Sequence, residues 1–279
     1  MLPHRLRPYA DGLAVLGATA VCIVLCTFTY PMKSKWPGLP PAVGKYEVLS
    51  YGYGDRELSY RNIGMMLQNA GDVGGNVTNL RDYNYKNVGD WLWATYGLSP
   101  KANYVPSLAA FYFGAVPDKT KLPYLIDYLE KVGKDEGFER WRWLAHAVYL
   151  TRFEMKDYDR ALKLANELAA LPDPDMPIWT KQMPAFVMSK VGKKQAARDL
   201  MLTILATDKG IDPAEVNQTC WYINEHLRER ADNLEKNEIY RLFCAHIWDP
   251  THKDRLTPEN PEEEKRERAL DAKTVHDDE

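Results

Sequence analysis

The sequence predicts an all-α protein in which one membrane-spanning helix precedes a helical domain. The first observation is a run of 21 residues between Asp11 and Lys33 that contains no charged side chain. The second is that apolar residues from Glu57 to the late 240s recur at steps of three and four, the spacing of amphipathic helices. The third is that the alternation of polar and apolar residues that marks half-buried strands is nearly absent.

The uncharged run predicts a membrane anchor. As a helix it reaches about 31 Å, enough to cross a hydrocarbon core of roughly 30 Å. We therefore predict a transmembrane helix over residues 12–32 that follows a short basic tail over residues 1–11. Tyr30 and Trp36 suit a membrane interface, and Pro31 would end the helix.

Two other interpretations of this run remain open, a cleaved signal peptide and a helix buried in a soluble core. The run is long for a signal peptide and ends in Thr27–Tyr30 rather than in small residues. Because a short basic tail is easily kept in the cytoplasm, we expect a single-pass protein of the bacterial inner membrane whose C-terminal domain lies outside the cytoplasm, in the periplasm. Cys220 and Cys244 are candidates for a disulfide there, and two reduced core cysteines are the alternative.

After the anchor the chain divides into three predicted parts. Residues 33–56 are rich in Pro, Gly and Tyr, which predicts an extended linker. Residues 57–248 form the helical domain, in which short breaks separate helices and predict antiparallel helix pairs. Residues 249–279 have too few apolar side chains to bury, so we expect a disordered tail or a solvated helix. The helices predicted with bounds are Val105–Val116, Leu122–Val132, Pro213–Arg230 and Asn233–Trp248.

Two segments share a finer pattern in which a short turn is followed by a small residue. Met155–Leu162 places an Asp-Tyr turn before Ala161, and Val191–Ala197 repeats the arrangement 36 positions later with Ala197. This pattern resembles the junction of a tetratricopeptide repeat, whose period is about 34 residues. Ala185 stands where such a repeat has a small residue in its first helix.

The resemblance implies a right-handed α-solenoid of helical hairpins, in which axes approach closely only at small side chains. It covers about Asp90 to Asp212 and departs from the family in places. Leu125 matches Ala161 in phase but is not small, and Tyr149 and Ala145 stand where the repeat has a small residue and a tryptophan. A helical bundle without repeats is the alternative fold.

Few residues in the sequence point to reaction chemistry. The formal net charge of −3 and the isoelectric point near 6.1 argue against nucleic acid. The Gly-rich run Gly71–Asn76 follows no strand and precedes no phosphate-binding Lys, so we interpret it as a flexible connector between helices. A zinc site is the best metal candidate, but its four residues diverge on their helices: Cys220, His226, Cys244 and His246. We therefore expect no metal, no cofactor, no small-molecule substrate and no catalytic residues.

The resulting hypothesis is a membrane-anchored scaffold or adaptor that holds another protein. A solenoid of hairpins exposes the faces of its first helices, and aromatic and Arg residues there are typical interface anchors. The predicted partner-binding residues are Tyr104, Tyr112, Trp141, Arg142, His146 and Arg152. A structural subunit of a larger membrane complex is one alternative, and a helical cell-envelope hydrolase is another.

Overall fold

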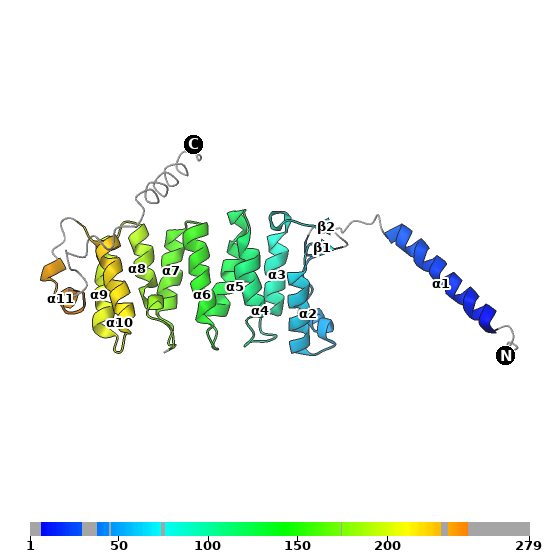
Figure 1. The fold of residues 1–279 in the computed structure, drawn as a ribbon, viewed down its shortest axis with the longest axis horizontal. Helices are drawn as coiled ribbons and strands as arrows, with labels where there is room; N and C mark the ends of the chain where they lie inside the picture. The colour runs from blue at the N-terminus through cyan, green and yellow to red at the C-terminus, as the bar shows by residue number, and fades with distance from the viewer. Residues whose placement is uncertain are drawn as a thin grey trace, which may run out of the picture. The chain divides into compact units, whose positions relative to one another are not determined.

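The computed structural model describes residues 7–29, 38–44, 46–73, 76–173, 175–229 and 234–244, and it is mostly helical. The predicted all-α class is thereby confirmed for the described residues (Figure 1). The chain divides into two compact units, Met1–Tyr128 and Leu129–Glu279, and the boundary falls within one helix, α5 (Pro123–Gly133).

The predicted anchor is a helix in the structure. Helix α1 spans Arg7–Thr29, and its Gly12–Thr29 portion has a mean hydropathy of 2.2 with no residue buried. This one N-terminal helix is long and apolar enough to cross a membrane. The predicted end of the anchor and its interfacial residues, from Tyr30 to Trp36, lie outside the described residues.

The rest of the first unit is a series of helices joined by short turns. Helix α2 (Arg56–Gln68) is followed by the strands β1 (Asp72–Val73) and β2 (Asn76–Val77) and by helix α3 (Tyr85–Thr95). Helix α4 (Tyr104–Ser107) continues through a π-helical turn (Leu108–Tyr112) into a short 3₁₀ helix (Phe113–Ala115). Three further 3₁₀ turns are Glu47–Gly52, Leu80–Asp82 and Lys119–Lys121.

Part of the predicted linker packs against the domain, which differs from the extended spacer that we expected. The Leu39 side chain is 2% exposed. The Asn87 amide donates to the Leu39 carbonyl at 3.0 Å, and the Trp91 indole donates to the Pro40 carbonyl at 2.9 Å. Both donors belong to α3, and burying them requires acceptors, which the Pro-rich segment supplies with its carbonyl groups.

The Gly-rich connector also has more order than we expected. Its β1 and β2 strands pair antiparallel, with Asp72 opposite Val77. Gly71 has a φ of +83°, and the Tyr83 hydroxyl donates to the neighbouring Ala70 carbonyl. Residues 74 and 75, between the two strands, lie outside the described residues.

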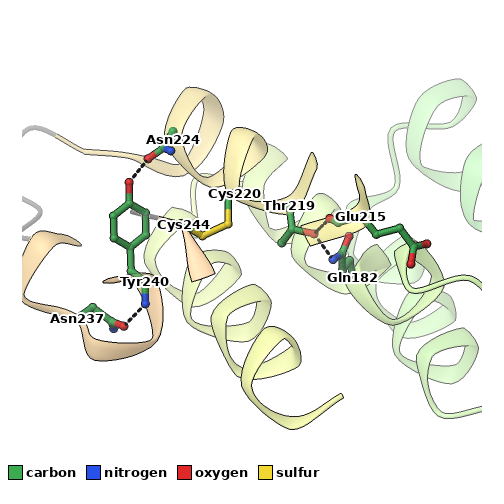
Figure 2. The surroundings of a disulfide bond; sticks show 8 residues. All are labelled: Gln182, Glu215, Thr219, Cys220, Asn224, Asn237, Tyr240 and Cys244. Atoms are coloured by element: carbon green, nitrogen blue, oxygen red, sulfur yellow. Dashed lines mark hydrogen bonds between the residues drawn. A yellow bond between two sulfur atoms is a disulfide. The ribbon is translucent and has the colours of Figure 1, made fainter. Parts of the chain in front are cut away.

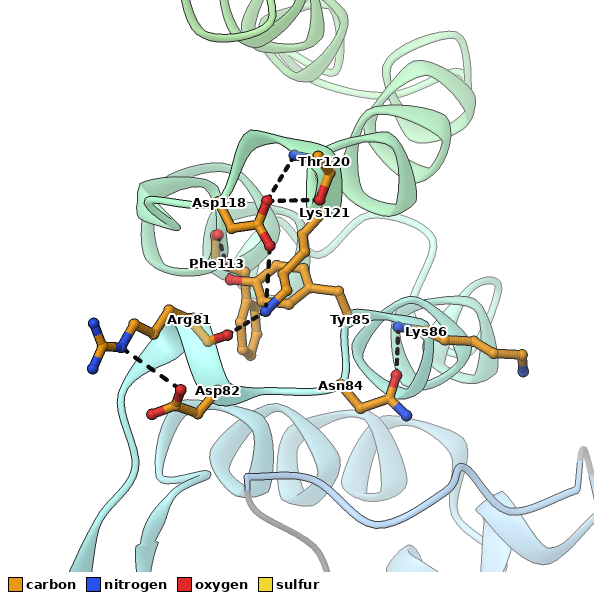
Figure 3. A network of polar contacts seen from close by, with 9 residues as sticks. All are labelled: Arg81, Asp82, Asn84, Tyr85, Lys86, Phe113, Asp118, Thr120 and Lys121. Atoms are coloured by element: carbon orange, nitrogen blue, oxygen red, sulfur yellow. Dashed lines mark hydrogen bonds and ion pairs between the residues drawn. The ribbon is translucent and has the colours of Figure 1, made fainter. Parts of the chain in front are cut away.

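A polar network holds the start of α3 against the segment before α5 (Figure 3). The Tyr85 hydroxyl donates to the Phe113 carbonyl at 2.8 Å, and burial raises the pKa of Tyr85. The Lys121 ammonium donates to the Arg81 carbonyl, lies 5.7 Å from the Tyr85 ring centroid and lies 3.8 Å from the Asp118 carboxylate. These contacts join the start of α3 and the turn before it to the segment between Phe113 and Lys121.

The second unit is a sequence of helical hairpins. Helix α6 (Trp141–Tyr149) continues through a π-helical turn (Leu150–Glu154) and is followed by α7 (Tyr158–Ala169), α8 (Trp179–Lys190) and α9 (Lys194–Thr207). Helix α10 (Pro213–Tyr222) also ends in a π-helical turn (Ile223–Leu227), and a 3₁₀ turn (Leu234–Lys236) leads to α11 (Glu238–Phe243). Consecutive helices from α6 to α9 pack side by side (Figure 1).

The small residues picked out by the repeat pattern lie at helix contacts. Ala161 on α7, Ala185 on α8 and Ala197 on α9 are all completely buried. The backbones of α5 and α6 approach even more closely at Gly133, where a Cβ atom would lie 2.3 Å from the Leu144 backbone nitrogen. The predicted turn before α7 is present, with the Asp157 carboxylate accepting from the Arg160 amide at 3.0 Å as an N-cap.

The last hairpin is shorter than predicted. Its first helix begins as expected, with Asp212 capping the Ala214 amide at 2.7 Å and Pro213 in the first turn, but the helical segment ends at Leu227. The second helix, α11, begins only at Glu238, where Asn237 caps the Tyr240 amide, and residues 245–248 lie outside the described residues. The predicted 249–279 tail also lies outside them.

A disulfide joins Cys220 of α10 to Cys244 after α11, and both cysteines are completely buried (Figure 2). Of the two interpretations left open for these cysteines, the structure selects the disulfide. Beside it the Tyr240 hydroxyl donates to the Asn224 side-chain oxygen at 2.6 Å, a second link between the same two segments.

Candidate interaction surface

Apart from Phe138 in the turn before α6, the exposed aromatic residues of the second unit's described part lie on α6, α8 and α10 and on the π-helical turn after α6. On α6 and its π-helical turn, the side chains that reach the surface recur at steps of three and four. We call them the α6 face: Arg142, His146, Tyr149, Arg152 and Phe153. Three of the five, Arg142, His146 and Arg152, are predicted partner-binding residues, and they lie together on one helix face.

The aromatic rings of the α6 face form a row. The ring centroids of His146 and Tyr149 are 5.5 Å apart, and those of Tyr149 and Phe153 are 5.1 Å apart. Tyr149 is 46% exposed and Phe153 is 50% exposed, which is high for large side chains in mutual contact. The row thus offers a partner a rigid aromatic surface without reorganisation of the helix.

Two arginines flank the row in different electrostatic settings. Arg142 is exposed and pairs with Glu139 at 2.6 Å, a surface ion pair of little energetic value. Arg152 is half-buried and lies over the Phe153 ring, with 4.5 Å between the guanidinium carbon and the ring centroid. Burial lowers the pKa of Arg152, opposed by Tyr222 and Tyr158, and its Nε atom has no hydrogen-bond partner within the described residues. Because this Nε atom is buried, it is a desolvated donor within the domain rather than a group offered to a ligand.

Trp141 belongs to the interior rather than to the surface. Its side chain is 7% exposed, and its ring meets the Trp179 ring edge-on at a centroid distance of 5.5 Å. Trp141 supports the α6 face by joining α6 to α8, and only the flanking Arg142 guanidinium, 5.2 Å from its ring, lies at the surface.

The predicted partner-binding residues Tyr104 and Tyr112 belong to the first unit. The Tyr104 hydroxyl donates to the Gln68 side-chain oxygen, and its ring lies so near Gly64 that a Cβ atom there would be 2.5 Å away. The Tyr112 ring contacts the Phe113 ring at 5.0 Å and adds to the rise in the pKa of Tyr83, which burial dominates. Both tyrosines are half-buried and bind neighbouring elements of their own unit.

A cavity of about 70 Å³, which we did not predict from the sequence, lies between α8 and α10. We call it the α8–α10 cavity. Aromatic and polar side chains line it, together with Ile178: Trp179, Gln182, Phe186, Glu215, Gln218, Thr219, Trp221 and Tyr222. Trp179 and Trp221 are 36% and 40% exposed, so these two lining residues reach the protein surface.

The cavity has a fixed polar wall. The Gln182 amide nitrogen donates to the Thr219 hydroxyl at 2.7 Å, and that hydroxyl donates to the Glu215 carbonyl at 2.7 Å (Figure 2). Both Gln182 and Thr219 are nearly fully buried. The rings opposite are fixed as well, since Phe186 packs edge-on against Tyr222 at a centroid distance of 4.9 Å.

Helix phase in the sequence marks one wall of this cavity, although not the cavity itself, which two helices form. Trp179, Gln182 and Phe186 follow one another at steps of three and four, as Arg142, His146 and Tyr149 do on α6. The available signal was the recurrence of aromatic residues along α8 and α10, which resembles the pattern on α6.

The zinc candidate is not assembled. Among the described residues no group of three or more His, Cys, Asp or Glu side chains could hold a metal ion, and Cys220 and Cys244 are bonded to each other. His226 packs against the rings of Trp221 and Tyr222, and His246 lies outside the described residues.

Comparison with known proteins yields no relative. No protein-family model matches the chain, and neither a curated protein nor a solved structure matches it. The tetratricopeptide pattern therefore stays a resemblance carried by the residues of this chain.

Proposed function

We propose that this protein is a membrane-anchored adaptor whose hairpins stack as a tetratricopeptide-like, right-handed solenoid and hold another protein. The observation that carries the proposal is the α6 face, a row of half-exposed rings flanked by two arginines. Tyr, Trp and Arg are the residue types enriched in the centres of protein interfaces. In this arrangement binding requires no catalytic group of the adaptor itself.

The proposed location is a membrane, with the second unit in an oxidising compartment. Helix α1 would be retained as the anchor, because its apolar surface is fully exposed to solvent over Gly12–Thr29. The buried Cys220–Cys244 disulfide supports export, since such bonds form and persist outside the reducing cytoplasm. We therefore propose a single-pass protein of the bacterial inner membrane with its C-terminal domain in the periplasm.

Site-specific photo-crosslinking in cells tests the adaptor function. A photoreactive phenylalanine analogue replaces Phe153 on the α6 face and, as a matched control, Lys163 on α7, whose side chain is 69% exposed. We expect a discrete crosslinked protein from position 153, identified by mass spectrometry, and none from position 163. Equal crosslinking from both positions, or none from either, would contradict the proposed docking surface.

Two substitutions probe the predicted residues in the two units. Arg142→Ala removes an exposed guanidinium of the α6 face, and Tyr112→Ala removes a half-buried ring of the first unit. If the α6 face is the docking surface, Arg142→Ala reduces recovery of the crosslinked partner at unchanged protein level. Unchanged recovery with Arg142→Ala would remove Arg142 from the proposed surface, and unchanged recovery with Tyr112→Ala would reject the prediction that Tyr112 binds the partner.

A further inference from the structure

The α8–α10 cavity combines aromatic walls with hydrogen-bond acceptors. Its rings come from Trp179, Phe186, Trp221 and Tyr222. Ring faces carry negative charge density, and a cation within about 6 Å of a ring centroid is attracted to it. Several rings around a small space are therefore a favourable environment for a positively charged group.

The hydrogen bonds of the polar wall leave acceptor atoms, rather than donors, without a partner. Because the Thr219 hydroxyl donates its only proton to the Glu215 carbonyl, its oxygen must accept from Gln182, which fixes the amide orientation. The Gln182 side-chain oxygen is then an acceptor without a donor among the described residues. Together with the carboxylate of Glu215, this oxygen makes two acceptors among the lining residues.

Glu215 also lines this cavity, and its carboxylate has no salt-bridge partner within the part of the chain that the structure describes. Glu215 stands in the first turn of α10, where the partial positive charge of the helix terminus stabilises an anion. No Lys, Arg or His lines the cavity. Two basic residues outside the lining interact with it: the His226 ring packs against Trp221 and Tyr222, and Arg152 interacts electrostatically with Tyr222.

From these features we propose that the α8–α10 cavity binds the cationic side chain, an ammonium or a guanidinium, of a Lys or Arg residue on the protein partner. The inference rests on the proposed function, since it names the chemistry of the partner segment that docks beside the α6 face. A carboxylate and two exposed tryptophans complement a positive charge, whereas a neutral aliphatic side chain would leave Glu215 without a partner.

The size of the cavity agrees with this occupant. When volume is counted as the space open to the centre of a water-sized sphere, a cavity needs about 10–15 Å³ to hold one water molecule. The observed value of about 70 Å³ therefore admits a charged head group with its last methylene groups, and not a large aromatic side chain. The apolar stem of Lys or Arg would lie against the exposed tryptophans.

The test uses the full-length protein in detergent micelles and two small probes. Nα-acetyl-lysine methylamide carries the ammonium group, and Nα-acetyl-norleucine methylamide is its neutral analogue of nearly equal shape. Dissociation constants are measured by saturation-transfer difference NMR at low and high salt. We expect the lysine probe to bind about five-fold more tightly than norleucine, with the difference shrinking at high salt.

Matched variants locate the site. Glu215→Gln should weaken lysine binding about five-fold, whereas Glu225→Gln, an exposed carboxylate of the following π-helical turn, should change it less than about two-fold. Trp221→Leu, on the other wall, should weaken it comparably, which guards against a local effect of Glu215 on the start of α10. Thermal melting confirms that each variant is folded.

The outcomes separate this inference from the adaptor proposal. Equal binding of both probes, or equal effects of Glu215→Gln and Glu225→Gln, overturns the cation site even if position 153 forms crosslinks. Selective lysine binding without crosslinks supports the cation site and overturns only the docking of a protein on the α6 face.

Discussion

At the scale of single residues, alanine decides how closely the helices of the second unit approach. Ala161, Ala185 and Ala197 are completely buried at contacts between neighbouring helices. Protein interiors are close-packed, so additional methylene groups at such positions force side chains from their rotamers or move a helix. An exposed position such as Ala196 can accept a larger side chain, because no neighbouring helix packs against it.

Ala197→Leu is therefore expected to destabilise the protein by about 1–3 kcal/mol through overpacking. Ala196→Leu is the matched control, because Ala196 precedes it on α9 and is exposed. The measurement is the free energy of unfolding of both variants by urea denaturation in detergent. Equal stabilities of the two variants would show that the α8–α9 contact does not depend on a small side chain.

Trp141 and Phe153 show that aromatic residues at the two ends of one helical segment have different roles. Trp141→Ala should cost about 3–5 kcal/mol, because the ring is buried against Trp179. Phe153→Ala should change stability by less than about 1 kcal/mol, since half of its side chain is exposed. Unfolding curves for both variants decide between a structural and a surface role. A large loss with Phe153→Ala would mean that the α6 face is part of the core.

At the scale of elements, the predicted helices Val105–Val116 and Leu122–Val132 agree with the structure to within one residue at each end, whereas the inner ends of the last hairpin do not. The turn before α7 depends on local chemistry, an Asp157 cap over the first helical amides, so the sequence pattern identified it correctly. The π-helical turns that end α6 and α10 depend on packing against neighbouring helices, and no local residue pattern marks them. Similarly, the carbonyls of Leu39 and Pro40 bind side chains about fifty positions away.

The candidate surface was predictable to the same degree. Arg142, His146 and Arg152 lie on one face of α6 and its π-helical turn, and their role in partner binding stays a prediction. Helix phase could not separate a buried Trp141 from a half-exposed Trp179, because both begin first helices and only the packing of the adjacent helix decides which ring is covered. The α8–α10 cavity depends on two helices at once, so spacing within either helix alone did not reveal it.

The disulfide stabilises the final hairpin as an element. Cys220 and Cys244 are 24 positions apart, and closing a loop of that size is worth about 3 kcal/mol in the chain-entropy model. We expect the double variant Cys220→Ser and Cys244→Ser to lose about that much stability. It should no longer respond to reductant, whereas reductant should lower the melting temperature of the unaltered protein.

The matched control for this prediction lies in α1. Cys22→Ser and Cys26→Ser remove the two exposed free thiols and should leave the reductant response unchanged. If the melting temperature of the unaltered protein is insensitive to reductant, the Cys220–Cys244 bond does not contribute to stability.

At the scale of the whole molecule, the helical anchor and the disulfide together predict sidedness. Helix α1 has 23 residues and an apolar span in which no residue is buried, which would allow membrane attachment, and a buried disulfide would suit an oxidising compartment. Both features are consistent with one arrangement, the N-terminus in the cytoplasm and the C-terminal domain beyond the membrane. Each also permits a direct test on the unaltered chain.

Protease protection distinguishes the two possible orientations. In intact spheroplasts, protease added from outside should digest the C-terminal domain, while in inside-out vesicles the domain should be protected until detergent is added. A cytoplasmic marker protein must stay intact in the spheroplasts as the control for sealing. The chain should also stay in the membrane fraction after alkaline carbonate extraction, since α1 is expected to insert. Protection in spheroplasts would place the domain in the reducing cytoplasm, where the Cys220–Cys244 disulfide is not expected to persist, and the export proposal would then be wrong.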